Sequence, residues 1–404
     1  METKNQNYSR RDFISKAPLA FASVGLLKVS ETGSRLPIPV KDRRVQQGDI
    51  VYRTLGRTGL KIPVVSMGVM NADNPEIVKN AYEAGIRLFD TAEGYQGGRN
   101  ERMVGTVINQ LNARKDVIIQ TKIPHPDRRA RGGRTTSSDR VRSAFLSSFE
   151  GCRERLQTDY VDILMIHDVS TARIMNDPGV HEAMDTLKKE NKIRFTGFST
   201  HSNQAAMLNE AARTGYYDVV LASFNFTMSD DQRLLEAVKN AASENIGVIA
   251  MKTQASSGRS RGGNVNQTAA LKWALNQEGI VTAIPGFTNF DHMKEDFSVA
   301  YGLDYTPEER RFLGNSDTRQ AFSFCRQCAN CIGTCPEEVD IPALMRTHMY
   351  AAGYGNFYQA RDTIDGIHNS RSLKICSKCP VCVAQCSHSV DIVSNIDELK
   401  LMYA

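Results

Sequence analysis

An acid, a phenol, an amine and an imidazole occur at or just beyond the ends of three successive apolar segments. LFDTAEGY, residues 88–95, carries Asp90 and then presents Tyr95 on a Gly-containing loop, VIIQTK ends on Lys122, and VDILMIH ends on His167. Any one of these residues alone would be explained more simply as a solvated strand end or a satisfied polar core residue. If the segments are neighbouring strands of a parallel barrel, however, their carboxyl ends meet at one rim, where functional groups collect. The set of four therefore predicts one shared site.

These four residue types suit proton transfer to a carbonyl oxygen. A free tyrosine titrates near pH ~10 and is too weak an acid to protonate a carbonyl readily at neutral pH. A cation held close to the phenol favours the phenolate and lowers its pKa, and Lys122 could supply that cation. Asp90 would keep Lys122 charged and oriented, and His167 could hold the substrate oxygen or relay a proton.

Strand and helix patterns alternate from residue 51 to about residue 300. The segment YRTLGRTGLKIPVV predicts a hairpin, followed by a first barrel strand that runs up to Met70. The next seven strands are predicted near Leu88, Val117, Val161, Phe195, Val219, Gly247 and Val281. Helical spacing between strands groups apolar side chains on one face, as in Val104, Val107, Ile108 and Leu111, or Val180, Met184 and Leu187. Eight such repeats can close a parallel sheet into a barrel.

The chain here resembles the aldo-keto reductases. The residues that carry the resemblance are Asp90, Tyr95, Lys122 and His167 in DTAEGY, TK and LMIHD, with further likeness in YRTLGRTGLKIPVVSMG, GFS and IPG. It covers roughly residues 50–300 and is specific, because four separated motifs occur in the family's order. The resemblance implies an α/β fold, a (β/α)8 TIM barrel, and hydride exchange between NAD or NADP and a small carbonyl or alcohol substrate.

The resemblance also implies which residues contact the cofactor. Ser199 of the GFS segment would bond the nicotinamide carboxamide, and Thr200 stands where many members have asparagine. Met251 and Lys252, with the Gly-rich loop that follows them, would lie near the pyrophosphate. Gly286 of IPG opens the segment that would grip the adenosine end.

Several positions depart from the family's pattern. Leu221 replaces a glutamine that often bonds the carboxamide, and Met70 replaces a common glycine. Gly286 and His292 stand where many members carry lysine or arginine against a 2′-phosphate. Charge-assisted contacts are worth roughly 1.5–3 kcal/mol each, so their loss favours NAD slightly over NADP.

Eight of the nine cysteines lie beyond residue 320, in two runs with the same spacing. CRQCANCIGTCP and CSKCPVCVAQCS are both C-x2-C-x2-C-x3-C, the bacterial ferredoxin spacing for [4Fe–4S] clusters. Because the fourth cysteine of such a run ligates the other cluster, two groups are predicted, namely Cys325, Cys328, Cys331 with Cys386, and Cys376, Cys379, Cys382 with Cys335. The segments between the runs are predicted to be helical. A subgroup of aldo-keto reductases carries a C-terminal, ferredoxin-like domain of this kind.

Zinc and disulfides are the alternatives for these cysteines. Zinc usually takes paired C-x2-C knuckles, and three cysteines within seven residues crowd a tetrahedral site. Disulfides are the stronger rival in an oxidising compartment, where an even number of cysteines often means bridges.

The first thirty residues do not fit a barrel. Arg10 and Arg11 in SRRDFISK precede the mild apolar segment APLAFASVGLL, which is the layout of a twin-arginine export signal. That route carries folded proteins, typically with cofactors inserted beforehand, so it favours clusters over disulfides and predicts a periplasmic location. No apolar run approaches the roughly 18 residues of a membrane span.

Length and charge complete the prediction. The 404 residues exceed a barrel of about 250, and a net charge of +5 with interspersed signs does not point to nucleic acid. The expected organisation is a signal at 1–30, a linker at 31–49, the barrel at 50–315 and a mainly helical iron–sulfur domain at 316–404. The expected function is that of an exported oxidoreductase whose clusters serve a redox partner or the structure. The alternative is an electron-transfer protein with an inactive barrel.

Overall fold

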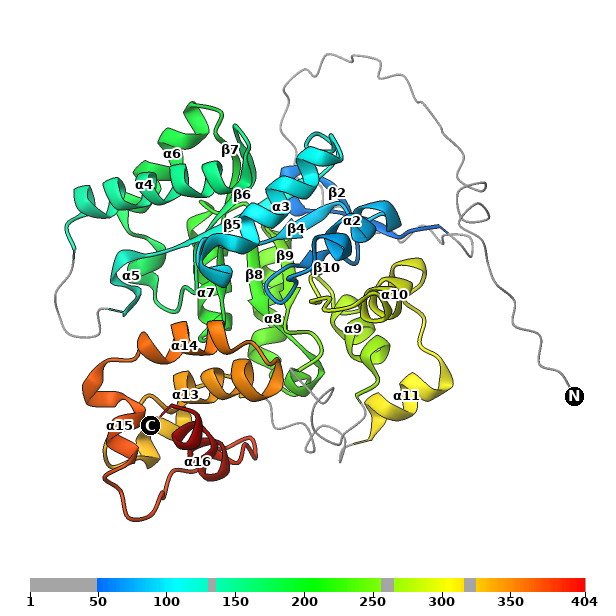
Figure 1. Ribbon diagram of the computed structural model, residues 1–404. Helices are drawn as coiled ribbons and strands as arrows, with labels where there is room; N and C mark the ends of the chain where they lie inside the picture. The colour runs from blue at the N-terminus through cyan, green and yellow to red at the C-terminus, as the bar shows by residue number, and fades with distance from the viewer. Residues whose placement is uncertain (1–48, 130–135, 256–264, 316–324, 404) are drawn as a thin grey trace, which may run out of the picture. The chain divides into compact units, whose positions relative to one another are not determined.

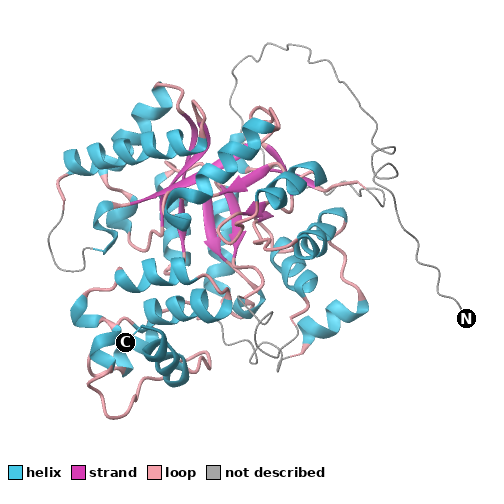
Figure 2. Ribbon diagram, in the orientation of Figure 1, coloured by secondary structure: helices cyan, strands magenta, loops and turns pink. Residues whose placement is uncertain are grey.

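Eight parallel strands form the central sheet of the computed structural model (Figures 1 and 2). The structure describes residues 49–129, 136–255, 265–315 and 325–403, so the predicted signal and nearly all of the linker lie outside the described residues. In sheet order the strands are β3 (Met67–Gly68), β4 (Leu88–Asp90), β5 (Ile118–Pro124), β6 (Val161–His167), β7 (Ile193–Thr200), β8 (Val219–Ser223), β9 (Gly247–Met251) and β10 (Ile280–Ala283). All eight predicted strand positions are confirmed.

Two parallel bridges join the first strand region to the last. Val65 pairs with Ala283, and Gly68 pairs with Gly286. The close approach requires glycine at position 68, because a Cβ there would lie 2.8 Å from the carbonyl oxygen of Ile284. The antiparallel hairpin of β1 (Tyr52–Thr54) and β2 (Lys61–Pro63) precedes the barrel, as its sequence predicts. The sheet therefore closes into a TIM-like barrel.

Helices follow the strands and cover the sheet. They are α2 (Pro75–Ala84), α3 (Arg99–Gln110), α4 (Ser138–Leu156), α5 (Ala172–Met175), α6 (Pro178–Lys189), α7 (Gln204–Thr214), α8 (Gln232–Ser243), α9 (Gln267–Leu275), α10 (Phe290–Ser298) and α11 (Pro307–Gly314). Local sequence signals start several of them. Asp177 accepts hydrogen bonds from the first turn of α6, and Thr306 forms a capping box with Glu309 at α11. The predicted apolar face of α6 is buried.

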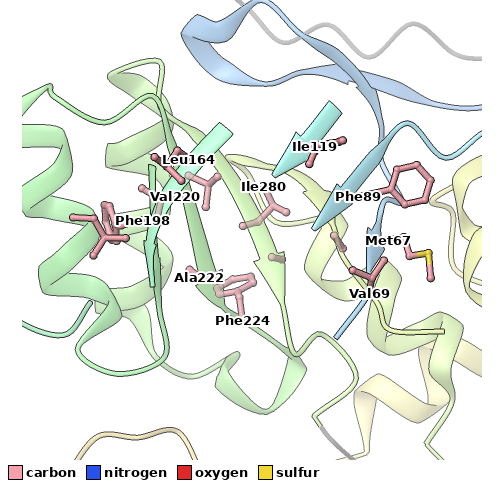
Figure 3. Packing of buried hydrophobic residues seen from close by; sticks show 14 of the residues in the cluster. Met67, Val69, Phe89, Ile119, Leu164, Phe198, Val220, Ala222, Phe224 and Ile280 are labelled. Atoms are coloured by element: carbon pink, nitrogen blue, oxygen red, sulfur yellow. The ribbon is translucent and has the colours of Figure 1, made fainter. Parts of the chain in front are cut away.

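Apolar side chains fill two separate regions around the strands. One set lies between strands and helices and includes Phe89, Leu164, Phe198 and Val220 (Figure 3). A smaller set fills the barrel interior and includes Leu88, Ile163, Met165, Leu221 and Ile249. Since successive strand residues face opposite sides, Asp90, Lys122 and His167 share the inward phase of Leu88, Ile118 and Met165.

The cysteine-rich region is mainly helical. Its helices are α13 (Ile341–His348), α14 (Phe357–Asp365), α15 (Leu373–Cys376) and α16 (Ile392–Tyr403), with a π-helical turn at Met349–Gly353. The helices predicted between the two cysteine runs are confirmed. Val339, Leu344, Ile396 and Leu399 form its apolar core, against which five of the cysteines pack. The described residues belong to one compact unit, and among them no helix is long and apolar enough to cross a membrane.

Candidate active site

Lys122 joins two other members of the predicted tetrad. Its amine donates to Asp90 Oδ2 at 2.7 Å, to the Thr91 carbonyl at 2.7 Å and to the Tyr95 hydroxyl at 3.4 Å. Gln120 holds the other Asp90 oxygen at 2.6 Å. The strand ladder explains this convergence, because β4 and β5 are neighbours and Asp90 lies opposite Gln120. The amine thus links the carboxylate to the phenol.

Tyr95 faces His167 across the mouth of the barrel. The two rings make an edge-to-face contact with centroids 5.8 Å apart. Tyr95 stands at the start of a short 3-10 turn (Tyr95–Gly98) in which Gln96 and Gly97 have left-handed backbone angles. The Gln96 side-chain amide donates hydrogen bonds to the carbonyls of Met70 and Ala72 at 3.3 and 3.1 Å, and these bonds anchor the turn. The structure therefore brings the four predicted residues into one site.

Asp90 and Lys122 are almost completely removed from water, at 3% and 1% exposure. Burial raises the pKa of Asp90, and the nearby Lys122 opposes that rise. Burial also lowers the pKa of Lys122, which Asp90 opposes. Each group favours the charged form of the other, so the pair acts as a coupled unit whose proton affinity depends on both members.

A cavity of about 190 Å³ opens beside Tyr95 and Asp90. Its lining includes Met251, Lys252 and Gly286, three of the five predicted cofactor contacts, together with Gly68, Met70, Gln254, Thr288, His292, Gly353 and Tyr354. The Gly-rich loop expected near the pyrophosphate falls mostly in 256–264, outside the described residues.

The other two predicted cofactor contacts, Ser199 and Thr200, do not line this cavity. The Ser199 hydroxyl accepts a hydrogen bond from the Asp168 amide at 3.0 Å, and the Thr200 hydroxyl donates to the Ser202 carbonyl at 2.9 Å. Both residues are buried. Ser199 is one of the β7 residues whose side chains point into the barrel, and this places it beside the end of β6.

Lys252 occupies an unusual position in this cavity. Its backbone is left-handed, with φ of 59°, and its amine lies 4.8 Å from the ring centroids of both Tyr350 and Tyr354. The pKa of Lys252 is lowered to about 7, mainly by burial and to a smaller extent by the positive charges of Arg346 and Lys122, while Asp90 opposes the fall. The aromatic faces stabilise the cation. Lys252 is therefore poised to change charge near neutral pH.

The C-terminal region contacts the barrel mouth at residues that sequence patterns did not identify. Arg346 forms an ion pair with Asp168 at 3.1 Å, and Asn356 donates to the side chain of Asn71 at 2.8 Å. The Tyr358 hydroxyl lies against Gly97, whose added Cβ would be 2.7 Å away. These contacts join segments far apart in the chain, so local periodicity carried no signal for them.

The eight C-terminal cysteines fall into two groups of neighbours. The pKa of Cys325 is raised to about 12, mainly by burial, and Cys331 and Cys386 contribute to this value. The pKa of Cys331 is raised to about 11, again mainly by burial, and Cys328 and Cys386 contribute to it. The pKa of Cys376 is raised to about 11, mainly by burial. Cys335, Cys382 and Cys379 contribute to this rise.

None of the nine cysteines, all of which lie in the described part of the chain, is in a disulfide. Within residues 49–129, 136–255, 265–315 and 325–403, no three His, Cys, Asp or Glu side chains converge closely enough to hold a single metal ion. The cysteine side chains of each group are therefore neighbours, but no three of them lie close enough together to bind one single ion.

The sequence profile of the aldo/keto reductase family matches residues 66–270. This chain belongs to the aldo/keto reductase family. The match spans β3 to α9 and includes Asp90, Tyr95, Lys122 and His167. It ends before the cysteine-rich region.

Two curated relatives show how much of this chain is similar in sequence to known proteins. The L-galactose dehydrogenase of Arabidopsis thaliana is 33% identical over 215 residues, which are 50% of this chain and 64% of the relative. The uncharacterized oxidoreductase YqkF of Bacillus subtilis is 25% identical over 307 residues, covering 66% of this chain and 96% of the relative. This aldo/keto reductase thus spans less than two thirds of the Arabidopsis protein. The family match and the sequence relatives support an oxidoreductase enzyme.

Solved structures share the fold of this aldo/keto reductase. The aldo-keto reductase AKR11C1 from Bacillus halodurans superposes with a TM-score of 0.54 at 19% identity, covering 67% of this chain and all of that one. The thermostable aldo-keto reductase Tm1743 gives a TM-score of 0.53 at 24% identity, covering 65% of this chain and 98% of that one. At such identities the likeness shows the barrel fold.

Proposed function

We propose that the barrel is an oxidoreductase that exchanges hydride between a nicotinamide cofactor and a small carbonyl or alcohol. The observation that carries this proposal is the continuous contact from Asp90 through Lys122 to Tyr95, with the His167 ring facing the phenol. A proton donor, a charge partner and a polar imidazole meet beside a cavity that has room for a ligand.

Each residue has a defined task in the reduction direction. Tyr95 gives its hydroxyl proton to the carbonyl oxygen as charge builds up on that oxygen. The Lys122 amine stabilises the phenolate that remains, and Asp90 orients the amine. His167 positions the substrate oxygen near the Tyr95 hydroxyl. A bound nicotinamide supplies the hydride.

The cavity beside Tyr95 fits a nicotinamide nucleotide in its donor set. Lys252 would hold the pyrophosphate, and Gly286 would admit the adenosine end close to the backbone. His292, which bonds Thr288 at 2.9 Å, occupies the place of an arginine that would grip a 2′-phosphate. Among the described lining residues Lys252 alone supplies a lysine or arginine charge, although Arg259 and Arg261 belong to the loop outside the described residues. These features support NAD slightly over NADP.

The cysteine-rich region would hold two [4Fe–4S] clusters. The neighbour groups Cys325, Cys328, Cys331, Cys386 and Cys376, Cys379, Cys382, Cys335 support crossed ligation, as in two-cluster ferredoxins. A cluster spaces four thiolates around several irons, so its ligands need not converge as they do around one ion. Metal binding would also deprotonate thiols whose pKa burial has raised. Such clusters supply one-electron transfer or structural support.

Export by the twin-arginine route would place the folded protein in the periplasm, as the segment with Arg10 and Arg11 favours. Free nicotinamide is expected to be scarce there. The nucleotide would therefore be loaded before export and bound tightly, and the presence of Tyr354 in the cavity lining supports tight binding.

The test is Tyr95→Phe in the full-length, cluster-containing protein. Carbonyl reduction with NADH or NADPH should fall at least ~10²-fold, as expected when acid catalysis is lost, while the cluster absorption stays unchanged. Tyr82→Phe is the matched control, because Tyr82 lies on α2 and bonds Asp116 away from the site. A Tyr95→Phe protein as active as wild type, purified without nucleotide, would favour the electron carrier with an inactive barrel.

A further inference from the structure

A second buried ion pair lies behind the turn that carries Tyr95. Glu101, in the first turn of α3, accepts a hydrogen bond from Arg155 Nε, in the last turn of α4, at 2.7 Å. The Glu101 side chain has no exposed surface, whereas 18% of the Arg155 side chain is exposed. Gly105 permits this contact, because an added Cβ would collide with the Leu156 carbonyl and force α3 and α4 apart. The reaction proposed above gives this ion pair no role.

Glu101 also contacts the strand that carries Lys122. Its other carboxylate oxygen accepts a hydrogen bond from the Thr121 hydroxyl at 2.5 Å. Thr121 directly precedes Lys122 on β5, and successive strand residues face opposite sides of the sheet. Thr121 therefore points outward to the helices while Lys122 points into the barrel. The Glu101 carboxylate thus holds the outer face of β5 at the position next to Lys122.

Asn100, beside Glu101, supports another partner of the Lys122 amine. Its side-chain oxygen accepts from the Thr91 hydroxyl at 2.8 Å, and its amide donates to two backbone carbonyls between β3 and α2. The Thr91 carbonyl in turn accepts from the Lys122 amine at 2.7 Å. The start of α3 is therefore bonded to the residue after Asp90 as well as to the residue before Lys122.

Arg155 packs against the turn that presents the phenol. Gly98 ends this turn with φ of 82°, a backbone conformation that favours glycine. A Cβ added to Gly98 would lie 2.7 Å from Arg155 Cδ, so the arginine side chain covers the back of the turn. The ion pair of Glu101 and Arg155 therefore touches the supports of both Lys122 and Tyr95.

The charge of Glu101 acts on Lys122 through the sheet. Burial lowers the pKa of Lys122, Asp90 opposes this fall most strongly, and Glu101 opposes it as well. The other titratable groups around Lys122 and Tyr95 are His167, His201 and Lys252 inside the barrel and Glu93, Cys152 and Arg155 outside it. Among the outer groups, Glu101 and Arg155 are joined in one ion pair, so their opposed charges balance each other.

We propose that Glu101 and Arg155 are positioning residues for the reductase, whose balanced charges behind β5 and the Tyr95 turn set the pH range over which Tyr95 keeps the proton that it gives to the carbonyl. This inference rests on the proposed carbonyl reduction and adds two residues to it. Neither residue lines the cavity beside Tyr95, so both act through Lys122 and the turn.

The two charges have opposite effects on the proton. An anion nearby favours the protonated form of the coupled Lys122 and Tyr95 side chains, and a cation disfavours it. Glu101→Gln leaves the Arg155 cation unbalanced, so the pH above which reduction is lost should fall by at least ~0.5 unit. Arg155→Met leaves the Glu101 anion unbalanced, so this pH should rise by about the same amount. The double variant should return to within about 0.2 unit of wild type.

The experiment measures kcat/KM for butanal with NADH in the full-length, cluster-containing protein from about pH 6 to about pH 10. Glu150→Gln is the matched control, because Glu150 also lies on α4 and pairs with Arg153 and Lys192 at the surface. Arg155→Lys keeps the cation and should stay near the wild-type profile, which tests the inference even if Glu101→Gln does not fold. Identical profiles of Arg155→Met and Arg155→Lys, or shifts of both single variants in the same direction, would overturn the inference.

Titration of the phenol tests the inference apart from the reaction. NMR of protein labelled with carbon-13 at tyrosine Cζ gives the midpoint for Tyr95 without substrate, and Tyr95→Phe assigns its signal. Opposite shifts of this midpoint in Glu101→Gln and Arg155→Met, with no aldehyde reduced, would end the proposed reaction and leave the effect of the ion pair standing. Reduction that depends on Tyr95, with the same midpoint in every variant, would overturn the inference and leave the reaction standing.

Discussion

Arg346 of α13 is ion-paired with Asp168, the residue that directly follows His167 in the barrel. Its guanidinium lies 3.1 Å from the carboxylate, and the Asp168 amide is bonded to Ser199 Oγ at 3.0 Å. Asp168 has a left-handed backbone, with φ of 60°, a region that Asp enters more readily than most residues, and these two contacts hold it there. The cysteine-rich region thus helps to orient the strand end that carries His167.

Arg346→Met should therefore impair both stability and reduction. The change removes the cation that faces the partly buried Asp168 carboxylate, which should lower the free energy of unfolding by roughly 3 kcal/mol. The kcat for carbonyl reduction should fall with little change in KM for NADH, because His167 loses its support. Chemical denaturation and steady-state kinetics measure the two effects.

Adding Asp168→Asn to Arg346→Met should restore more than half of the lost stability, since the side chain that has lost its cation is then neutral. Arg361→Met serves as the control, because its pair with Asp365 is exposed and worth little. A loss of stability in Arg361→Met equal to that in Arg346→Met would show that the ion pair has no special role.

Lys122→Met separates the structural and catalytic roles of the buried pair. The single change leaves Asp90 buried without its cation and should cost roughly 3–5 kcal/mol of stability. The double change Lys122→Met with Asp90→Leu should regain much of that stability but no carbonyl reduction, because the phenol still lacks its charge partner. Thermal unfolding and kcat/KM are measured side by side. Recovery of activity in the double variant would remove Lys122 from the mechanism.

Nucleotide affinity should depend on pH through Lys252. The pKa of its amine is lowered to about 7, so the amine is cationic below this pH and becomes neutral above it. A bound pyrophosphate favours the cation and raises that pKa, which means that binding takes up a proton and weakens as pH rises. NADH should bind roughly tenfold more weakly at about pH 8.5 than at about pH 6. Fluorescence titration measures this ratio, and it should be near one in Lys252→Met.

The crossed grouping of the cysteines predicts which cluster each substitution damages. Anaerobically prepared protein should contain about eight irons per chain. Cys335→Ser should affect the cluster held by Cys376, Cys379 and Cys382, whereas Cys386→Ser should affect the one held by Cys325, Cys328 and Cys331. Mössbauer or EPR spectra of the two variants should differ. Zinc in stoichiometric amount without iron, or four disulfides, would rule out the clusters.

Export should depend on the paired arginines. Replacing Arg10 and Arg11 with lysine should retain the protein in the cytoplasm with its clusters intact, because the twin-arginine route requires the pair. Immunoblots of cell fractions measure the distribution. Unchanged recovery from the periplasm would refute the export signal.

The sequence by itself determined the barrel and the tetrad. Strand patterns placed Asp90, Lys122 and His167 at carboxyl ends, and the strand period of two then set these side chains inward. The order of the motifs was sufficient to predict the tetrad because each motif lies within a few residues of a strand end, so its signal is local in the sequence. The helices between the cysteine runs were predictable for the same reason.

Only the tertiary structure shows which side chains from the cysteine-rich region complete the mouth of the barrel. The Arg346–Asp168 pair joins residues 178 positions apart, and Tyr354 reaches the cavity of Lys252 from the cysteine-rich region. Ser199, which the resemblance assigns to the cofactor, also accepts a hydrogen bond from the Asp168 amide. Such contacts depend on how folded helices and strands pack against one another. The fit between two packed surfaces depends on both segments together, so the sequence of either segment alone does not predict it.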